Sequence, residues 1–148
     1  MTWANMARLL ETTDRLTPTQ QVTKISGAMA NFNVEQKIAI LNILNKDKLN
    51  ANNLGLAKAQ RWVSNIFDVF EDEIQGLVLA HNDLGEALYH LDVSATTQKE
   101  YSVKTILNTL QYDVGSEDKF EVIKEILSTI SANERRWFIR YLLRTPRN

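Results

Sequence analysis

The chain has 148 residues, of which 44% are hydrophobic and 24% charged, which suits one globular domain with a core of its own. It contains no cysteine, which excludes disulfides and thiolate metal sites. No basic start is followed by an apolar run, and no apolar stretch approaches the roughly 20 residues that span a bilayer. We therefore expect neither a secretory signal nor a membrane span, and we expect an intracellular protein.

The charge is unevenly distributed along the chain. The segment Glu134–Asn148 holds five arginines and one acid, which gives +4. Because the whole chain carries −1, the rest of it carries −5. A basic end on an acidic body indicates an anionic partner. The alternative is a last helix whose final turns are rich in cations because they complement the helix dipole.

Apolar residues recur at spacings of three and four almost throughout, and neither strand alternation nor a hairpin dipeptide is present. This pattern predicts an all-α fold, with one compact domain of about eight helices over residues 1–148. The alternative is two helical lobes joined at an exposed connection, Asp92–Glu100.

The first half contains three predicted helices. Thr17 followed by Pro18 is a typical helix start, and Asn33 with Gln36 resembles a capping box. The second helix should bury Val22, Ile25 and Met29. The predicted ranges are 2–13, 18–30 and a helix after Asn33 that carries Ile38, Leu41, Ile43 and Leu44, followed by a polar loop over Asn45–Asn53.

The second half begins with four predicted helices. Asp83 is placed to cap a short helix, and Ser102 is placed to cap the helix after the exposed connection. Phe70, Ile74, Leu77 and Val78 share the second of the four helices. The predicted ranges are about 54–67, 70–81, 84–91 and 103–113.

Two short motifs are candidate phosphate sites. In Gly115-Ser116, glycine can end one helix and serine can cap the next, whose backbone N–H groups would then attract an anion. Lys119 lies in the first turn and could reach the same anion. Asn82-Asp83-Leu84-Gly85 is a second candidate helix start of this kind, in which the capping residue is an acid, Asp83. Each motif is also simply a good turn between helices.

The final helix should start at a capping box formed by Ser131 and Glu134. On a helical wheel its four later arginines fall within roughly 80° of one another, whereas the large apolar residues lie mainly on the opposite side. We expect the apolar face to anchor the helix and the guanidinium face to look outward. Arginine suits phosphate because its planar fork donates two hydrogen bonds at once. The stripe comprises Arg136, Arg140, Arg144 and Arg147, and the anchor comprises Trp137, Phe138, Tyr141 and Leu142.

Catalytic motifs are absent from the sequence. His81 and His90 do not have the spacing of a helical His pair, and the acids Glu71, Asp72 and Glu73 suit a solvated helix face. No Gly-Lys-Ser/Thr phosphate loop and no Lys-x-Asp-Gly occurs. We expect no catalytic residue, metal site or cofactor in this chain.

Several of these segments resemble the N-terminal DNA-binding domain of ATP-dependent DNA ligases. Asp83-Leu84-Gly85 is similar to the Gly-Asp-x-Gly loop of that family, although Asn82 replaces its first glycine. Tyr101-Ser102-Val103 resembles the start of the next helix. Glu134–Arg140 is similar to the Glu-Ala-x-Phe-x-x-Arg pattern, and Arg147 stands where the family has its closing arginine.

The resemblance extends to Gly115-Ser116, Lys119 and the apolar pairs that follow, which look like the Gly-Ser…Lys…Leu-Leu segment of the family. It is clearest from about Leu54 to the end. In the family a nucleotidyltransferase domain with an adenylated lysine follows, and then an OB-fold domain. Neither fits in this chain, so we expect an excised or naturally isolated domain.

The resemblance implies a function without catalysis. Such domains hold nicked duplex DNA through backbone phosphates and the minor groove with little sequence specificity, and they support nick sealing in replication and repair. ATP and magnesium would act in the missing domains. We expect a monomer, and whether a sliding clamp also docks is left open. The implied contacts are Gly85, Gly115, Ser116, Lys119, Arg136, Arg140, Arg144 and Arg147.

Two other functions stay open at this point. One is an all-helical protein-interaction module whose arginine stripe meets an acidic partner. The other is an enzyme in its own right, for which the sequence offers no nucleophile, base or metal cluster.

Overall fold

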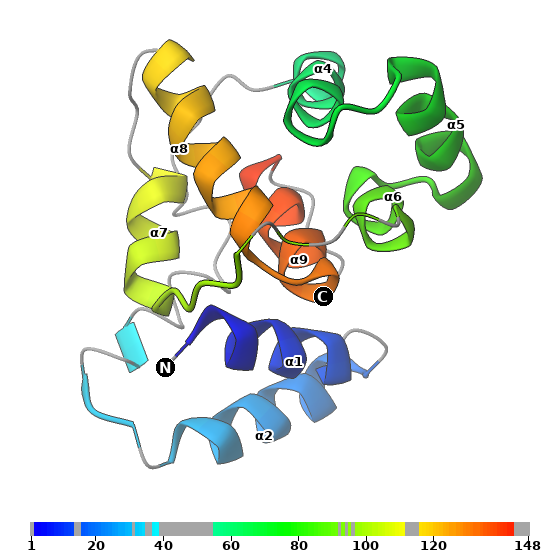
Figure 1. Ribbon diagram of the computed structural model, residues 1–148. Coiled ribbons are helices and arrows are strands. Elements are labelled where there is room, and N and C mark those ends of the chain that lie inside the picture. Colours follow the sequence, from blue (N-terminus) through cyan, green and yellow to red (C-terminus); the bar gives the residue numbers. More distant parts are fainter. Residues whose placement is uncertain are drawn as a thin grey trace.

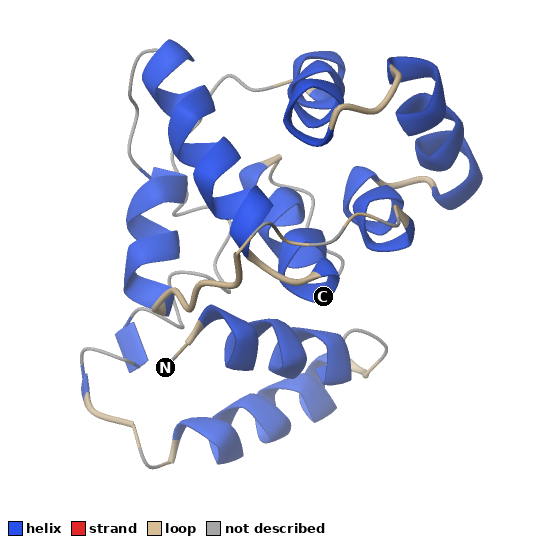
Figure 2. Ribbon diagram, viewed as in Figure 1, coloured by secondary structure: helices blue, strands red, loops and turns tan. Residues whose placement is uncertain are grey.

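The computed structural model describes residues 2–13, 16–30, 32–34, 37–38, 55–91, 93, 95, 97–111 and 116–143. The named elements in these ranges are all helices, which confirms the predicted all-α fold (Figures 1 and 2). One isolated antiparallel bridge pairs Thr2 with Ser102. The helices are α1 Trp3–Thr13, α2 Pro18–Met29, α4 Leu56–Phe67, α5 Glu71–His81, α6 Leu84–His90, α7 Val103–Gln111, α8 Ser116–Thr129 and α9 Ala132–Leu142.

Helix α9 lies at the centre of the domain, with α1, α6, α7 and α8 around it (Figure 1). The predicted capping box starts it: the Ser131 hydroxyl accepts from the Glu134 amide at 3.4 Å, and the Glu134 carboxylate accepts from the Ser131 amide at 3.3 Å. All residues from Arg135 to Leu142 are buried. The predicted apolar anchor is therefore confirmed, but it occupies only part of a helix that is covered on every side.

Helix α1 packs against the first half of α9. Trp3 is fully buried and donates from its indole nitrogen to the Glu134 carbonyl at 3.0 Å. Helix α2 starts at the predicted Thr17 cap with Pro18 in its first turn, and it packs against α1. Ile25 and Met29 pack partly against the core, but Val22 is 65% exposed, so its predicted burial is wrong. Contact with α1 covers only a narrow stripe of α2, and Val22 lies outside it.

Helices α4, α5 and α6 form a curved row on the other side (Figure 1). Asp68 ends α4 and Asn82 ends α5, both with a left-handed backbone. Helix α5 begins at Glu71, one residue later than predicted, because Phe70 occupies the N-cap position. Trp62 packs edge-on against Phe120 of α8 with ring centroids 5.4 Å apart, and this contact connects α4 with α8.

The segment between α6 and α7 is hydrogen-bonded to other elements of the domain. The Lys99 amide donates to the Thr129 carbonyl at 2.9 Å, and Ser102 caps α7 as predicted, accepting from the Thr105 amide at 3.1 Å. Buried residues from both sides of this segment form one core cluster. The predicted Asn33–Gln36 capping box lies partly outside the described residues, and the Asn45–Asn53 loop lies wholly outside them.

Candidate functional site

The Asp83-Leu84-Gly85 motif forms the start of α6. The Asp83 carboxylate accepts from the Gly85 amide at 3.3 Å and from the Glu86 amide at 3.0 Å, which confirms its predicted capping role. A Cβ atom on Gly85 would lie 2.6 Å from the Arg136 carbonyl oxygen and 2.9 Å from Cγ of Arg140. Glycine is therefore required at this position, because the backbone of α6 packs there directly against the backbone and a side chain of α9.

Arg140 binds the same helix start from α9. Its Nε donates to Oδ2 of Asp83 at 2.7 Å, and its Nη2 donates to Oε1 of Glu86 at 3.0 Å. The guanidinium also lies 4.6 Å from the Trp137 ring centroid. Arg140 is 1% exposed. Its charge is thus matched by two carboxylates that are themselves held by the first turn of α6.

Arg136 lies one turn earlier and connects three helices. Its Nη1 donates to Oε1 of Glu86 at 3.0 Å, and its Nη2 donates to Oε1 of Glu11 at 3.0 Å. Nη2 also donates to Oδ1 of Asn133 at 2.6 Å, and the guanidinium stacks on the Tyr89 ring at 3.9 Å. We call Glu11, Asp83, Glu86, Arg136 and Arg140 the interhelical ion network.

The expectation of an outward arginine stripe is wrong for Arg136 and Arg140, which are 8% and 1% exposed. The final segment is poor in acids, but α1 and α6 bring three carboxylates to it from elsewhere in the chain. Lys119, expected to reach an anion, is 4% exposed. Gly85 is buried against α9, and its amide, predicted to be available to phosphate, donates to the Asp83 carboxylate.

The remaining predicted contacts are only partly visible. Ser116 is the first residue of α8, whereas the sequence predicted it as the N-cap, and its side chain is not among those described. Gly115, Arg144 and Arg147 lie outside the described residues.

Arg135 is a buried cation that the sequence prediction missed. Its Nε donates to the Leu127 carbonyl at 2.8 Å in the last turn of α8, and its Nη1 donates to the Val93 carbonyl at 2.7 Å. Its guanidinium lies 4.7 Å from the Phe67 ring centroid. Burial lowers the pKa of Arg135, and the negative end of α8 partly offsets the cost of burying its charge. The signal that the sequence offered for this role was the position of Arg135 directly after the Ser131–Glu134 capping box, in the first turn of α9.

Glu86 is the acid that both network arginines share. Burial alone would raise its pKa, but the hydrogen bond and charge of Arg136, followed by those of Arg140, lower the pKa below its ordinary value. The carboxylate form is therefore the one that the folded protein stabilises.

This lowered pKa predicts acid sensitivity. The contribution of Glu86 to stability should be complete above the unfolded pKa of about 4.3 and should be lost as pH falls through the lower folded pKa. We expect Glu86→Gln to be less stable than the wild type at neutral pH, with a difference that narrows below pH 4.3. Urea unfolding at a series of pH values measures this, and a constant difference would contradict it.

The two histidines meet at the α5–α6 junction. The rings of His81 and His90 stack with centroids 4.2 Å apart, and Nε2 of His90 lies 3.6 Å from Oε2 of Glu86. Across the described residues no group of three or more His, Cys, Asp or Glu side chains could hold a metal ion. The described helices also include none that is long and apolar enough to cross a membrane.

In the comparison with curated proteins, no sequence matches this chain. The family model described as "DNA ligase N terminus" matches residues 5–147, which is almost the whole chain. The interhelical ion network joins two of the segments that resemble this family, because Asp83 belongs to the first and Arg140 to the second. The chain therefore belongs to the family of N-terminal domains of ATP-dependent DNA ligases.

Proposed function

We propose that this domain grips duplex DNA around a nick, without catalysis of its own, and so supports nick sealing by a ligase in replication and repair. The observation that carries the proposal is the family match over residues 5–147. Contacts would go to backbone phosphates and the minor groove, which gives affinity with little sequence preference. ATP and magnesium would act in the catalytic domains of the full-length enzyme.

In this proposal the family-like residues have two different tasks. Gly85, Arg136 and Arg140 hold α6 against α9 and are occupied inside the domain. The start of α8 at Gly115-Ser116, together with Arg144 and Arg147, supplies the contacts with phosphate. A helix start attracts phosphate through its N–H groups, and an arginine fork binds it bidentately.

The described helices differ in the charges that they would present to DNA. Helices α2 and α7 contain no acid, and they expose Lys24 and Lys104 among short polar side chains. Helix α5 instead opens with the exposed acids 71–73, which would repel phosphate. The start of α8 follows α7 along the chain, but its first turn carries Glu117 and Asp118, so the proposed contact there relies on backbone N–H groups and not on a surplus of positive charge.

The alternative of a protein-interaction module has lost its main support. It required an arginine stripe free to meet an acidic partner, whereas Arg136 and Arg140 meet acids of their own chain. An acidic partner would therefore have to compete with a buried network.

The proposal is tested by fluorescence anisotropy with a labelled nicked duplex. We expect binding at low salt, and we expect unlabelled duplexes of unrelated sequence to compete equally. Absence of binding at low salt would refute the proposal for this domain, and strong sequence preference would refute contacts that are mainly with the backbone.

Replacing Arg144 or Arg147 by alanine should weaken binding evenly across sequences. Each lost phosphate contact should lower the magnitude of the slope of log K against log salt by about 0.9. The matched control is Arg61→Ala, an exposed arginine on α4 beside the acidic start of α5. An equal change in the salt slope for Arg61→Ala would show that the slope depends only on the net charge of the domain.

A further inference from the structure

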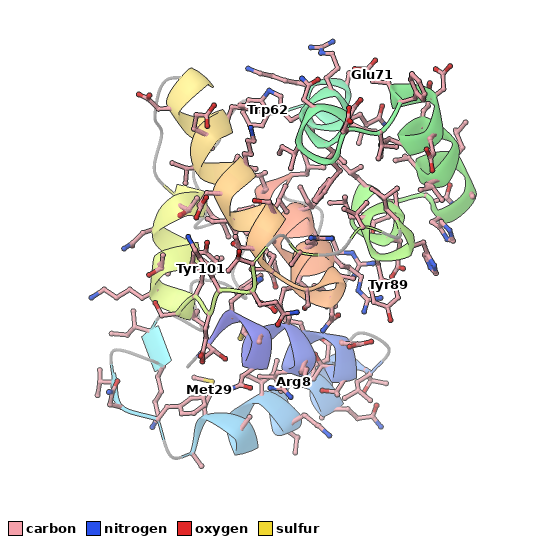
Figure 3. The ribbon with its side chains drawn as sticks, viewed as in Figure 1. Arg8, Met29, Trp62, Glu71, Tyr89 and Tyr101 are labelled. Atoms are coloured by element: carbon pink, nitrogen blue, oxygen red, sulfur yellow. The ribbon has the colours of Figure 1, made fainter. Side chains whose placement is uncertain are left out.

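Helix α5 lies at the outer edge of the domain, where it packs against α4 and α6 (Figure 1). Its inner face consists of Ile74, Leu77 and Val78, which pack in or against the core. Figure 3 shows Glu71 at the start of the helix, whose first turn is acidic. After this turn, residues 74–80 include a single polar side chain, that of Gln75. Helix α5 is therefore apolar around almost its whole circumference beyond the first turn.

The side of α5 that faces solvent carries a stripe of its own. Asp72, Gly76, Leu79 and Ala80 lie at positions i, i+4, i+7 and i+8, and on a helical wheel they fall on the side away from Ile74. We call these four residues the outer stripe of α5. All four are exposed, and Leu79 is 74% exposed. A helix that is apolar on all sides is typically covered on all sides, whereas the domain covers only one side of α5.

Gly76 is not explained by contacts inside the domain. Glycine within a helix lowers stability relative to alanine. At Gly85 glycine is needed because a Cβ atom would lie 2.6 Å from the backbone of α9, but a Cβ atom at Gly76 would meet nothing within 4 Å. The φ angle of Gly76 is not positive either, so no left-handed turn requires glycine there. The missing side chain instead leaves the backbone of α5 accessible to a molecule outside the domain.

We propose that the outer stripe of α5 binds a basic amphipathic helix of a separate partner protein. The apolar side of the partner helix would pack over Gly76 and beside Leu79, because a missing side chain lets two helices approach closely. Cations of the partner would face Asp72 and Glu73 at the start of α5. Neither acid forms an ion pair within the described part of the chain, so both are available to a partner.

Charge favours this partner over other occupants. DNA would be repelled by the acids 71–73, and so would an anionic membrane surface. A second copy of the chain would match poorly. Two parallel α5 helices would oppose acids to acids, and two antiparallel ones would oppose acids to the end at Ala80, Asn82 and Asp83, which offers no cation. A basic helix matches both the acidic start and the apolar remainder of the stripe.

Helix α5 is not among the proposed phosphate contacts, so binding of a partner here is independent of the DNA-binding proposal. The partner is basic, whereas a module built on the arginine stripe of α9 would need an acidic one. The surface consists of one short helix, and a small contact of this kind suits a transient complex.

Two displayed libraries of helical peptides test the proposal on the domain without DNA. Both vary the apolar residues along one face, and they differ only in their charged positions, which are lysine in one library and glutamate in the other. We expect only the lysine library to yield peptides that bind the wild type and lose binding to Leu79→Ser. Enrichment from the glutamate library, enrichment from neither, or lysine peptides that ignore Leu79→Ser would overturn the proposal. Co-sedimentation of the domain with phosphatidylcholine vesicles would assign the stripe to lipid and overturn it as well.

Titration calorimetry with the tightest lysine peptide then locates the contact. Leu79→Ser should weaken binding by about tenfold or more, which is the loss expected when one buried leucine side chain is removed. The matched control is Val22→Ser, which removes a 65% exposed apolar side chain from α2 and should leave the affinity unchanged. Equal effects of the two substitutions would overturn the assignment of the contact to α5.

Gly76→Gln separates binding from folding. Glutamine is a better helix former than glycine, and its Cβ would meet nothing inside the domain, so the urea midpoint of unfolding should not fall. The same side chain would occupy the place where the partner helix approaches, so the affinity for the peptide should fall by about tenfold or more. Circular dichroism checks that the helices are intact. Unchanged affinity for the peptide would overturn the close approach of a helix at Gly76.

Discussion

Replacement of Arg140 by alanine should lower the free energy of unfolding by about 3–5 kcal/mol. The guanidinium is buried and donates to both Asp83 and Glu86. Its removal would leave Asp83 without its arginine and Glu86 with Arg136 alone, and the desolvation cost already incurred would no longer be fully offset. Urea unfolding at neutral pH, followed by circular dichroism, measures the loss.

The matched control for Arg140 is the exposed Arg61. Arg61→Ala removes the same charge from a surface position and should change stability by less than about 0.5 kcal/mol. Arg140→Lys should be intermediate, because an ammonium cannot reproduce two directed hydrogen bonds from a planar fork. A loss below about 1 kcal/mol for Arg140→Ala would show that Arg140 is solvated and available to DNA.

The same variant distinguishes an internal role from a contact with phosphate. If Arg140 acts only inside the domain, the folded fraction of Arg140→Ala should bind a nicked duplex with an unchanged salt slope. A phosphate contact would instead lower the magnitude of that slope by about 0.9. Anisotropy titrations at several salt concentrations, at a temperature where the variant remains folded, decide between the two roles.

Gly85→Ala should destabilise the domain by about 1–3 kcal/mol, although alanine is the better helix former. The new Cβ would lie 2.6 Å from the Arg136 carbonyl oxygen, which is backbone and cannot rotate away. The variant must therefore separate α6 from α9, and this movement strains the ion pairs of Arg140 with Asp83 and Glu86. Thermal and urea unfolding measure the change.

Gly76 provides a control with the opposite expected sign. It also lies within a helix, but a Cβ at Gly76 would meet nothing within 4 Å. Gly76→Ala should therefore stabilise the domain by about 1 kcal/mol through helix propensity alone. Stabilisation by both substitutions would show that α6 and α9 are not in close contact at Gly85.

Local features of the fold could be predicted from the sequence because their causes are local. Thr17, Asp83, Ser102 and Ser131 each cap the helix that the pattern predicted. A cap needs only a short polar side chain within reach of N–H groups two or three residues later, so its signal lies within one turn of helix. Val22 was misplaced since burial also depends on how much of a helix its neighbours cover.

The arginines show where local inference ends. Arg136 and Arg140 form one stripe on the wheel, as expected, but the wheel does not show which face is covered. Their acidic partners lie 50, 57 and 125 positions away in sequence. No spacing rule connects such residues, and only the packing of α1 and α6 against α9 brings them together.

The sequence by itself determined the all-α class, most helix starts and the ligase N-terminal family, because periodicity, capping and family motifs are properties of nearby residues. The tertiary structure alone decided what the motif residues do within the domain. It buries Arg140 against Asp83 and places Gly85 where α6 meets α9. A buried charge needs a counter-charge and a close helix contact needs a missing side chain, and which residues meet these needs is settled only when distant helices pack together.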